Sequence, residues 1–150
     1  HNLPSGEVFT APAGAEGEVC FDVPMTVEGR RVRDVQLRFE DDEVTAFDAA
    51  EGADAIESVL ETDAGAHRLG ELGVGMNRGI TRPTDSILFD EKMAGTVHLA
   101  LGRAYDACVP DGTGNDSAVH VDLITRMGEG SRVEVDGEVV QRDGELTLDA

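Results

Sequence analysis

The stretches that decide the fold are VHLAL at residues 97–101 and VHVDLI at residues 119–124. Apolar residues alternate with other residues in both, and successive side chains of a β-strand point to opposite faces. Each stretch therefore predicts a strand with one apolar face. The other face carries His98 and Ala100 in the first strand, and His120, Asp122 and Ile124 in the second.

Further strands are predicted on both sides of this pair. Alternation around the Asp41-Asp42 turn is typical of an antiparallel meander. Asp136-Gly137 is a strong hairpin signal near the C-terminus. The stretches concerned are residues 19–23, 32–39, 44–47 and 72–76, and the hairpin at 132–148.

Helices are expected in two places only. Within residues 51–69, apolar side chains recur at helical spacing: Ala55, Ile56, Val59 and Leu60. A second, short helix is predicted to begin at Asp90 and to end at Met93, before Gly95. With 150 residues the chain has the size of one domain. The fold class is therefore α+β, a strand-rich mixed or antiparallel sheet with one or two helices.

Charge excludes several classes of partner. The chain has 31 acidic and 12 basic residues, a net charge of −19, and Lys92 is its single lysine. Such a surface repels phosphate backbones and anionic membranes, so we expect neither nucleic acid nor membrane as a partner. The acidity either attracts cations or basic peptides, or adapts the surface to high salt as in halophilic proteins. We favour the second interpretation because the acids are spread along the whole sequence.

The sequence also indicates a soluble, cytoplasmic protein. It contains no apolar run of about 18 residues that would span a membrane. Cys20 and Cys108 are far apart and lack metal-binding spacing, so free buried thiols in a reducing cytoplasm are the default expectation, although a disulfide stays open.

His120 and Asp122 form the most informative motif. Side chains two residues apart on a strand share a face and lie about 6.5–7 Å apart, so an imidazole and a carboxylate can converge on one metal ion. The alternative is a solvated face on which Asp122 merely orients His120. His98 adds a second imidazole on a similar strand, and two histidines with one carboxylate suit catalytic zinc or Fe(II). His67 is expected to be exposed.

Motifs of other enzyme classes are missing from the sequence. It has no GxxxxGK[ST], HExxH or GxSxG motif, and the glycines of residues 70–79 do not keep GxGxxG spacing. Nucleotide binding and serine hydrolase chemistry are therefore not indicated.

Several stretches resemble one family in the order that the family has them. The chain is similar to the two-metal aminopeptidases of the aminopeptidase T and aminopeptidase S type. The matching stretches are LPSGEVFTAP (3–12), GELGVGMN (70–77), LFDEK (88–92), VHLALGRAY (97–105) and NDSAVHVD (115–122).

This resemblance implies an enzyme and a set of site residues. The activity implied is a metallo-aminopeptidase, a hydrolase that releases N-terminal residues from a peptide substrate through a metal-activated water. The cofactors would be two divalent ions (Zn, Co or Mn). Tyr105 would bind a metal or stabilise the oxyanion, and Glu71 would pass a proton to the leaving amine. The metal ligands implied are Glu7, Glu71, His98, His120 and Asp122.

The resemblance has one departure and two competing functions. Family members are longer, so we expect residues 1–150 to be the C-terminal metal-binding catalytic domain of a larger aminopeptidase, whose N-terminal α/β domain this chain lacks. That domain helps to form a homodimer in the family, and the activity of this segment alone is then in question. The alternatives are a ring-cleaving dioxygenase of related fold, with Fe(II) on His98, His120 and Asp122, and a non-catalytic metal-stabilised assembly domain. Glu7 and Glu71 favour the peptidase because the iron site does not need them.

Overall fold

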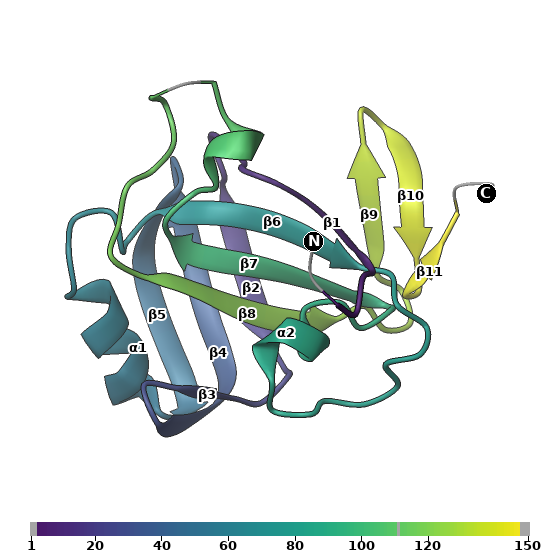
Figure 1. Ribbon diagram of the computed structural model, residues 1–150, viewed down its shortest axis with the longest axis horizontal. Helices are drawn as coiled ribbons and strands as arrows, with labels where there is room; N and C mark the ends of the chain where they lie inside the picture. Colours follow the sequence, from purple (N-terminus) through teal and green to yellow (C-terminus); the bar gives the residue numbers. More distant parts are fainter. Residues whose placement is uncertain (1–2, 111, 148–150) are drawn as a thin grey trace.

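The computed structural model describes residues 3–110 and 112–147. Its centre is an antiparallel sheet with strand order β1-β6-β7-β8 (Figure 1). The strands are β1 (Glu7–Thr10), β6 (Leu69–Gly75), β7 (Thr96–Gly102) and β8 (His120–Arg126). The two stretches that decide the fold thus form strands, as predicted, and these strands are adjacent.

A second antiparallel sheet forms around β4. One edge of β4 pairs with β2 and β3 in succession, and the other edge pairs with β5. These strands are β2 (Gly17–Phe21), β3 (Met25–Val27), β4 (Arg30–Glu40) and β5 (Glu43–Glu51). The predicted meander is confirmed, with β3 as an additional short strand.

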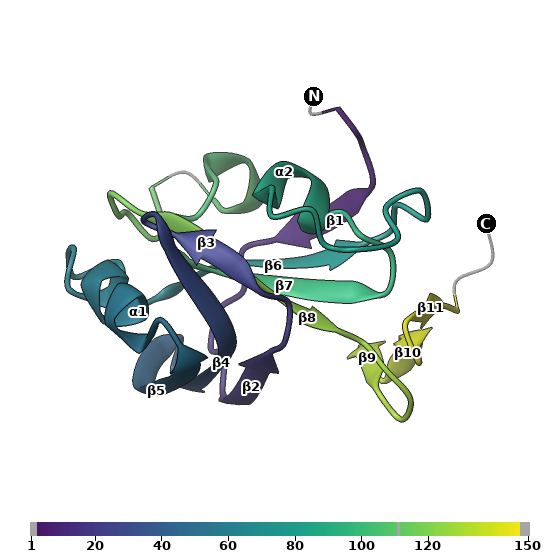
Figure 2. The same ribbon diagram turned by 90° about the horizontal axis from the view of Figure 1, so that it is seen from below.

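The two sheets pack face to face with their strands running in different directions (Figures 1 and 2). Leu101 and Leu123 of the first sheet and Phe21, Leu37 and Phe39 of the second belong to one buried core. Burial of these apolar faces supplies the main driving force for the sheets to associate. The core occupies one face of the β1-β6-β7-β8 sheet, which leaves the opposite face for other side chains.

Helix α1 (Ala53–Leu60) confirms the longer predicted helix in a shorter form. Its buried residues are the four apolar ones at helical spacing, and it packs on β4 and β5. The chain after Leu60 turns instead of continuing, and Asp63 accepts a hydrogen bond from the backbone N–H of Ala66 (2.9 Å).

The second helix was predicted in the wrong place. Helix α2 spans Ile87–Asp90, so Asp90 ends it. The buried Asp90 carboxylate accepts hydrogen bonds from the backbone N–H groups of Thr84 (2.8 Å) and Asp85 (3.0 Å). It closes the preceding turn and does not cap a following helix. α2 lies on the side of β7 that faces away from the second sheet (Figure 2).

The C-terminal hairpin turns at Asp136-Gly137 as predicted. It consists of β9 (Arg132–Val135), β10 (Glu138–Arg142) and β11 (Glu145–Leu146), and it projects from the two sheets (Figure 1). The strand-rich α+β class is therefore confirmed, with antiparallel pairing in every strand pair of the described part.

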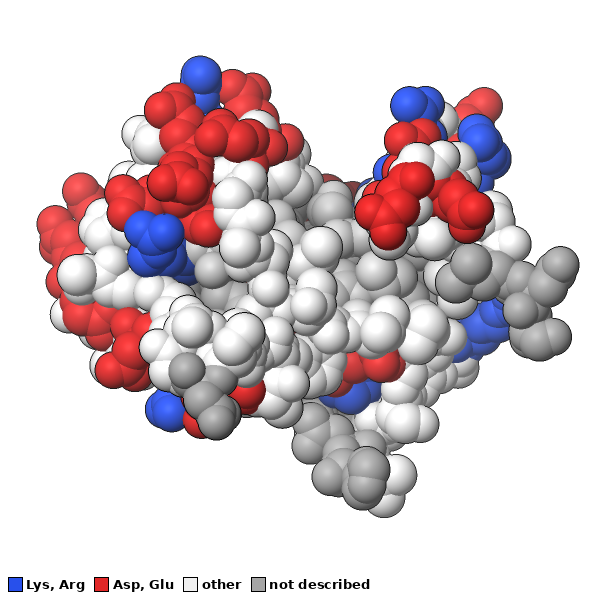
Figure 3. Space-filling view, turned by 90° about the horizontal axis from the view of Figure 1, so that it is seen from above, with Lys and Arg blue, Asp and Glu red and all other residues white. Residues whose placement is uncertain are grey.

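Surface features bear on the predictions for His67 and the two cysteines. His67 is exposed, as predicted. Cys20 and Cys108 are both free, but the expectation that they are buried is wrong, because Cys20 is exposed and Cys108 only partly buried. Within the described residues no helix has the length and apolar character needed to cross a bilayer. Acidic side chains gather at two ends of the face in Figure 3, with a largely uncharged band between them.

Candidate metal centre

The register of the β1-β6-β7-β8 sheet explains how five ligand-type side chains come together. All five residues implied by the resemblance point to the face opposite the core, and each lies across from a glycine or an alanine on a neighbouring strand. Such small residues leave room for long side chains to lean over their neighbours. The pairs are Glu7 with Gly75, His98 with Gly73, Glu71 and Asp122 with Ala100, and His120 with Gly102.

Gly73 is the most demanding of these small residues. A β-carbon at this position would lie 2.0 Å from Nε2 of His98, so the imidazole occupies the space above the Gly73 backbone. His98 is fully buried (0% exposed). Its position therefore depends on glycine at residue 73.

The side chains form two clusters that share Glu71. His98 Nε2 lies 3.2 Å from Glu71 Oε1 and 3.6 Å from Glu7 Oε2. His120 Nε2 lies 3.8 Å from Glu71 Oε2 and 3.5 Å from Asp122 Oδ2. In each cluster the candidate ligand atoms lie within 4.8 Å of one another. Each Glu71 oxygen thus faces a different histidine.

The orientation of His120 is set by the backbone. Its Nδ1 lies 2.8 Å from the carbonyl oxygen of Arg103. A carbonyl only accepts hydrogen bonds, so Nδ1 carries the hydrogen and donates it. Nε2 is then left to face Glu71 and Asp122, as in metal-binding histidines whose second nitrogen donates to a carbonyl.

Buried polar atoms indicate that the clusters need a cation. Glu71 and Asp122 are only 4% and 7% exposed. Glu71 Oε2 and Asp122 Oδ1 are buried without a hydrogen-bond partner among the described residues. Such unsatisfied carboxylate oxygens are costly. Carboxylate oxygens together with imidazole nitrogens are a donor set that fits Zn²⁺, Co²⁺ or Mn²⁺.

The same negative field holds protons on the histidines. Hydrogen bonding to Asp122 and the charges of Asp122 and Glu71 raise the pKa of His120 to about 9, against the opposing effect of burial. Burial alone would lower the pKa of His98, but its hydrogen bond to Glu71 and the nearby carboxylates raise it. The ion-free cluster therefore attracts positive charge.

Tyr105 lies at the edge of the clusters and is not a packed core ring. It is 50% exposed, and its ring centroid lies 4.9 Å from that of His120 and 5.8 Å from that of Phe9. Burial, together with the charges of Glu71 and Asp122, raises the pKa of its hydroxyl. The hydroxyl therefore stays protonated at neutral pH and is suited to donate a hydrogen bond.

Two residues near the clusters, Lys92 and Glu91, were not identified as site residues from the sequence. Lys92 is 1% exposed, its Nζ lies 3.1 Å from Glu7 Oε1, and it also contacts Glu91. Burial is the largest influence on the pKa of Glu91 and raises it. Lys92 could have been singled out from the composition, because it is the single lysine of an arginine-rich chain and lies inside a motif of the resemblance.

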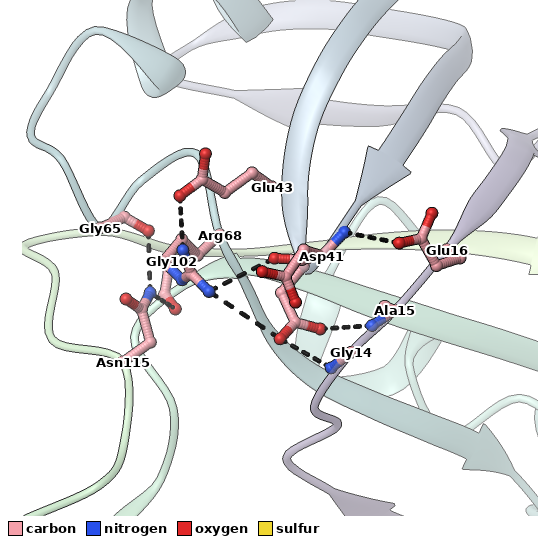
Figure 4. A network of polar contacts seen from close by, with 10 residues as sticks. Gly14, Ala15, Glu16, Asp41, Glu43, Gly65, Arg68, Gly102 and Asn115 are labelled. Carbon is pink, nitrogen blue, oxygen red and sulfur yellow. Dashed lines mark hydrogen bonds and ion pairs between the residues drawn. The ribbon is translucent and has the colours of Figure 1, made fainter.

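Asn115 fixes the loop that carries Tyr105. Its side-chain amide donates hydrogen bonds to the carbonyl oxygens of Gly65 (2.8 Å) and Gly102 (2.7 Å), as Figure 4 shows. The backbone carbonyl of Asn115 accepts a hydrogen bond from the backbone N–H of Ala104 (2.9 Å). The loop between β7 and β8 is thereby tied to the end of β7, which carries His98, and to the turn before β6.

A hollow of the described structure lies elsewhere. Its volume is about 900 Å³, and it lies between the loop at residues 76–83 and the C-terminal residues 143–146. None of the five cluster residues lines it. The clusters are therefore the better candidate for chemistry, because they combine convergent ligand atoms with unsatisfied burial.

Comparison with known proteins places the chain in a family. Residues 1–146 match the family model described as thermophilic metalloprotease (M29), and the chain belongs to this family of metalloproteases. It is 34% identical to aminopeptidase 2 of Geobacillus stearothermophilus, over 95% of this chain and 37% of that protein. It is 36% identical to aminopeptidase T of Thermus aquaticus, over 91% of this chain and 36% of that protein. The chain thus spans little more than a third of these relatives.

Solved structures show the same fold. Wild-type aminopeptidase T from Thermus thermophilus matches 98% of this chain and 41% of that chain, with a TM-score of 0.82 and 31% identity. A 2,5-dihydroxypyridine dioxygenase from Pseudomonas putida matches 97% of this chain and 44% of that chain, with a TM-score of 0.70 and 18% identity. The second likeness shows a shared fold alone.

Proposed function

We propose that residues 1–150 act as the metal-binding catalytic domain of a larger aminopeptidase that holds two divalent cations. The observation that carries this proposal is that the two ligand clusters share Glu71, whose oxygens face different histidines. A carboxylate placed between two cations suits a two-metal site, in which the ions lie about 3.5–4 Å apart. The named relatives are aminopeptidases, which supports the reaction class.

The chain's own groups suit peptide hydrolysis. Bound cations would polarise the scissile carbonyl and lower the pKa of a water molecule. Glu7 and Asp122 flank the shared Glu71 and hold the outer side of each cluster. Glu71 is also our candidate to accept a proton from the water and pass it to the leaving amine, a step in which one of its oxygens would leave its cation.

Tyr105 is our candidate oxyanion stabiliser. Its ring lies beside that of His120, and its raised pKa keeps the hydroxyl available as a donor. Loss of one such donor typically costs about 10²–10³ in kcat. Tyr105→Phe should therefore lower kcat while the metal content stays unchanged. An unaltered kcat would remove Tyr105 from the mechanism.

The experiment measures metals and turnover together. The native protein that contains this chain is purified in molar KCl, its bound metals are quantified, and cleavage of leucine p-nitroanilide is followed. We expect two divalent ions per chain and release of p-nitroaniline. Fewer than two ions together with no cleavage would overturn the proposal. Bound iron with oxygen uptake on a hydroxypyridine would replace it with the dioxygenase alternative.

Two further proposals concern the native protein as a whole. We propose a homodimer that acts on peptides in the cytoplasm. The family resemblance supports the dimer, and the free thiols of Cys20 and Cys108 suit a reducing compartment. Light scattering on the native protein tests the first proposal, and a monomer at micromolar concentration would contradict it.

A further inference from the structure

Lys92 is a buried cation beside a candidate metal ligand. Its side chain is 1% exposed and lies between two carboxylates, those of Glu7 and Glu91. A buried ammonium group is costly unless it is paired. The carboxylates of Glu7 and Glu91 supply this pairing.

The contacts divide the two oxygens of Glu7. Oε1 lies 3.1 Å from the Lys92 ammonium, whereas Oε2 faces His98 Nε2 at 3.6 Å. One oxygen is therefore held by the protein and the other points into the Glu7–Glu71–His98 cluster. This is the arrangement in which an outer partner orients a ligating carboxylate.

Hydrogen bonds fix the backbone around Glu7 relative to the backbone at Lys92. Asn77 donates its backbone N–H to the carbonyl of Lys92 (2.8 Å) and its side-chain amide to the carbonyl of Ser5 (2.8 Å). Strand β1 also pairs with β6 directly, Glu7 lying opposite Gly75. The distance between the two side chains is thus set by hydrogen bonds on both sides.

The choice of lysine is informative because every other Lys or Arg residue of this chain is arginine. A guanidinium group presents a planar fork that binds both oxygens of one carboxylate, whereas an ammonium group is a compact point charge. An ammonium group that binds Oε1 therefore leaves the second oxygen of Glu7 free.

We propose that Lys92 is a positioning residue that holds Glu7 as a one-oxygen ligand of the cluster with Glu71 and His98. This inference rests on the proposed two-metal function. Glu91 holds the ammonium from its other side. A Glu7 limited to one oxygen keeps a coordination position open for water or substrate, as catalytic metal sites require.

The test uses two substitutions in the native protein and a matched control. Lys92→Met keeps the apolar stem and removes the charge, and Lys92→Arg keeps the charge and adds the fork. Gln141→Met is the control, because it also replaces a fully buried polar side chain by methionine, but in the C-terminal hairpin. Zinc stoichiometry and both zinc affinities are measured by competition with a chelator, beside kcat and KM on leucine p-nitroanilide.

We expect both Lys92 variants to lose affinity at one of the two zinc sites by about 10–100-fold. The other site should keep its affinity, and kcat should fall more than KM rises. A merely structural role would not single out one of two sites. Gln141→Met should keep both zinc affinities and the kinetic constants.

The outcomes separate this inference from the proposed function. If the unaltered protein binds two zinc ions and cleaves the substrate, but a folded Lys92→Met matches it, the Lys92 inference is overturned and the function stands. Full activity in Lys92→Arg alone would overturn the one-oxygen geometry. If Lys92→Met does not fold, Lys92→Arg decides. If the unaltered protein fails to bind two ions, both proposals fall.

Discussion

At the scale of single residues, the site depends on side chains that are small. Gly73 leaves its space to the His98 ring, and Ala100 separates Glu71 from Asp122 across three strands. Adjacent strands lie about 4.8 Å apart, so carboxylates two strands apart reach a common centre only by leaning over what lies between them. Small residues between the ligands are therefore part of the site.

Gly73→Ala should disable this arrangement. The added β-carbon would lie 2.0 Å from His98 Nε2, and overpacking of this kind costs about 1–3 kcal/mol. We expect loss of metal affinity at the His98 cluster, together with a lower free energy of unfolding, measured by zinc titration and urea denaturation. Gly128→Ala is the matched control because a β-carbon there meets nothing within 4 Å. Wild-type zinc affinity in Gly73→Ala would show that the ring is free to move.

Protons and metals should compete for His120, because its pKa in the ion-free protein is raised to about 9. Below that pH a metal must displace the proton, so zinc affinity should rise by about tenfold per pH unit and level off near pH 9. The stability of the ion-free protein changes with pH in the opposite direction to the zinc affinity. The pKa of His120 is higher in the folded state than in the unfolded state. Its contribution to the free energy of unfolding is therefore fully present below the unfolded pKa of about 6.5 and is lost as pH rises through about 9.

The measurement for His120 is a pair of melting curves between pH 6 and 10. Chelator-treated protein should lose stability across this window while zinc-loaded protein should not. His67→Gln removes an exposed imidazole and should leave both curves unchanged. A chelated protein whose stability rises steadily toward pH 10 would contradict the assigned His120 pKa.

At the scale of elements, alternation predicted β4, β7 and β8 well because each of these strands has an apolar face in the core. Strand β1 was not among the predicted strands, since its residues are mostly exposed and carry no apolar row. Helix α2 was misplaced because Asp90 bonds backward to Thr84 and Asp85. Local patterns do not show whether an acidic side chain bonds forward or backward along the chain.

The candidate site was only partly predictable from spacing. His120 and Asp122 share a strand, so their common face follows from the sequence. Glu7 and Glu71 lie on other strands, and only sheet register brings them to the histidines. Lys92 precedes β7 in a loop after α2, where no periodicity applies. These three residues required either the resemblance or the structure.

The loop between β7 and β8 should depend on Asn115. Asn115→Ala leaves the carbonyls of Gly65 and Gly102 without their side-chain donor. We expect a loss of about 1–3 kcal/mol in the free energy of unfolding and faster hydrogen exchange at Ala104. Thr113→Ala is the control, since its hydroxyl bonds only within the loop, to Pro110. Equal effects of both substitutions would contradict an anchoring role for Asn115.

At the scale of the whole molecule, charge repulsion is the dominant electrostatic effect. The chain carries a net charge of −19, while most of its ion pairs join exposed side chains, as between Arg30 and Asp54. Such pairs contribute only about 0–1 kcal/mol each. Screening therefore removes more repulsion than attraction.

Stability should consequently increase with salt. The screening length falls from about 10 Å at 0.1 M to about 3 Å at 1 M ionic strength. We expect the melting temperature of the native protein to rise between 0.1 and 2 M KCl and to fall again on dialysis. An unchanged or falling melting temperature would contradict the interpretation of the acidic surface as an adaptation to salt.

The bond between His120 and the carbonyl of Arg103 has a consequence for how the site tolerates change. The group that fixes the imidazole belongs to the main chain, and the Arg103 side chain is exposed. Many residue types at position 103 would therefore present the same backbone carbonyl to His120. Proline is the exception, because it would remove the N–H that Arg103 donates to Val119. A survey of tolerated substitutions would rank this position as unimportant, although the orientation of His120 depends on it.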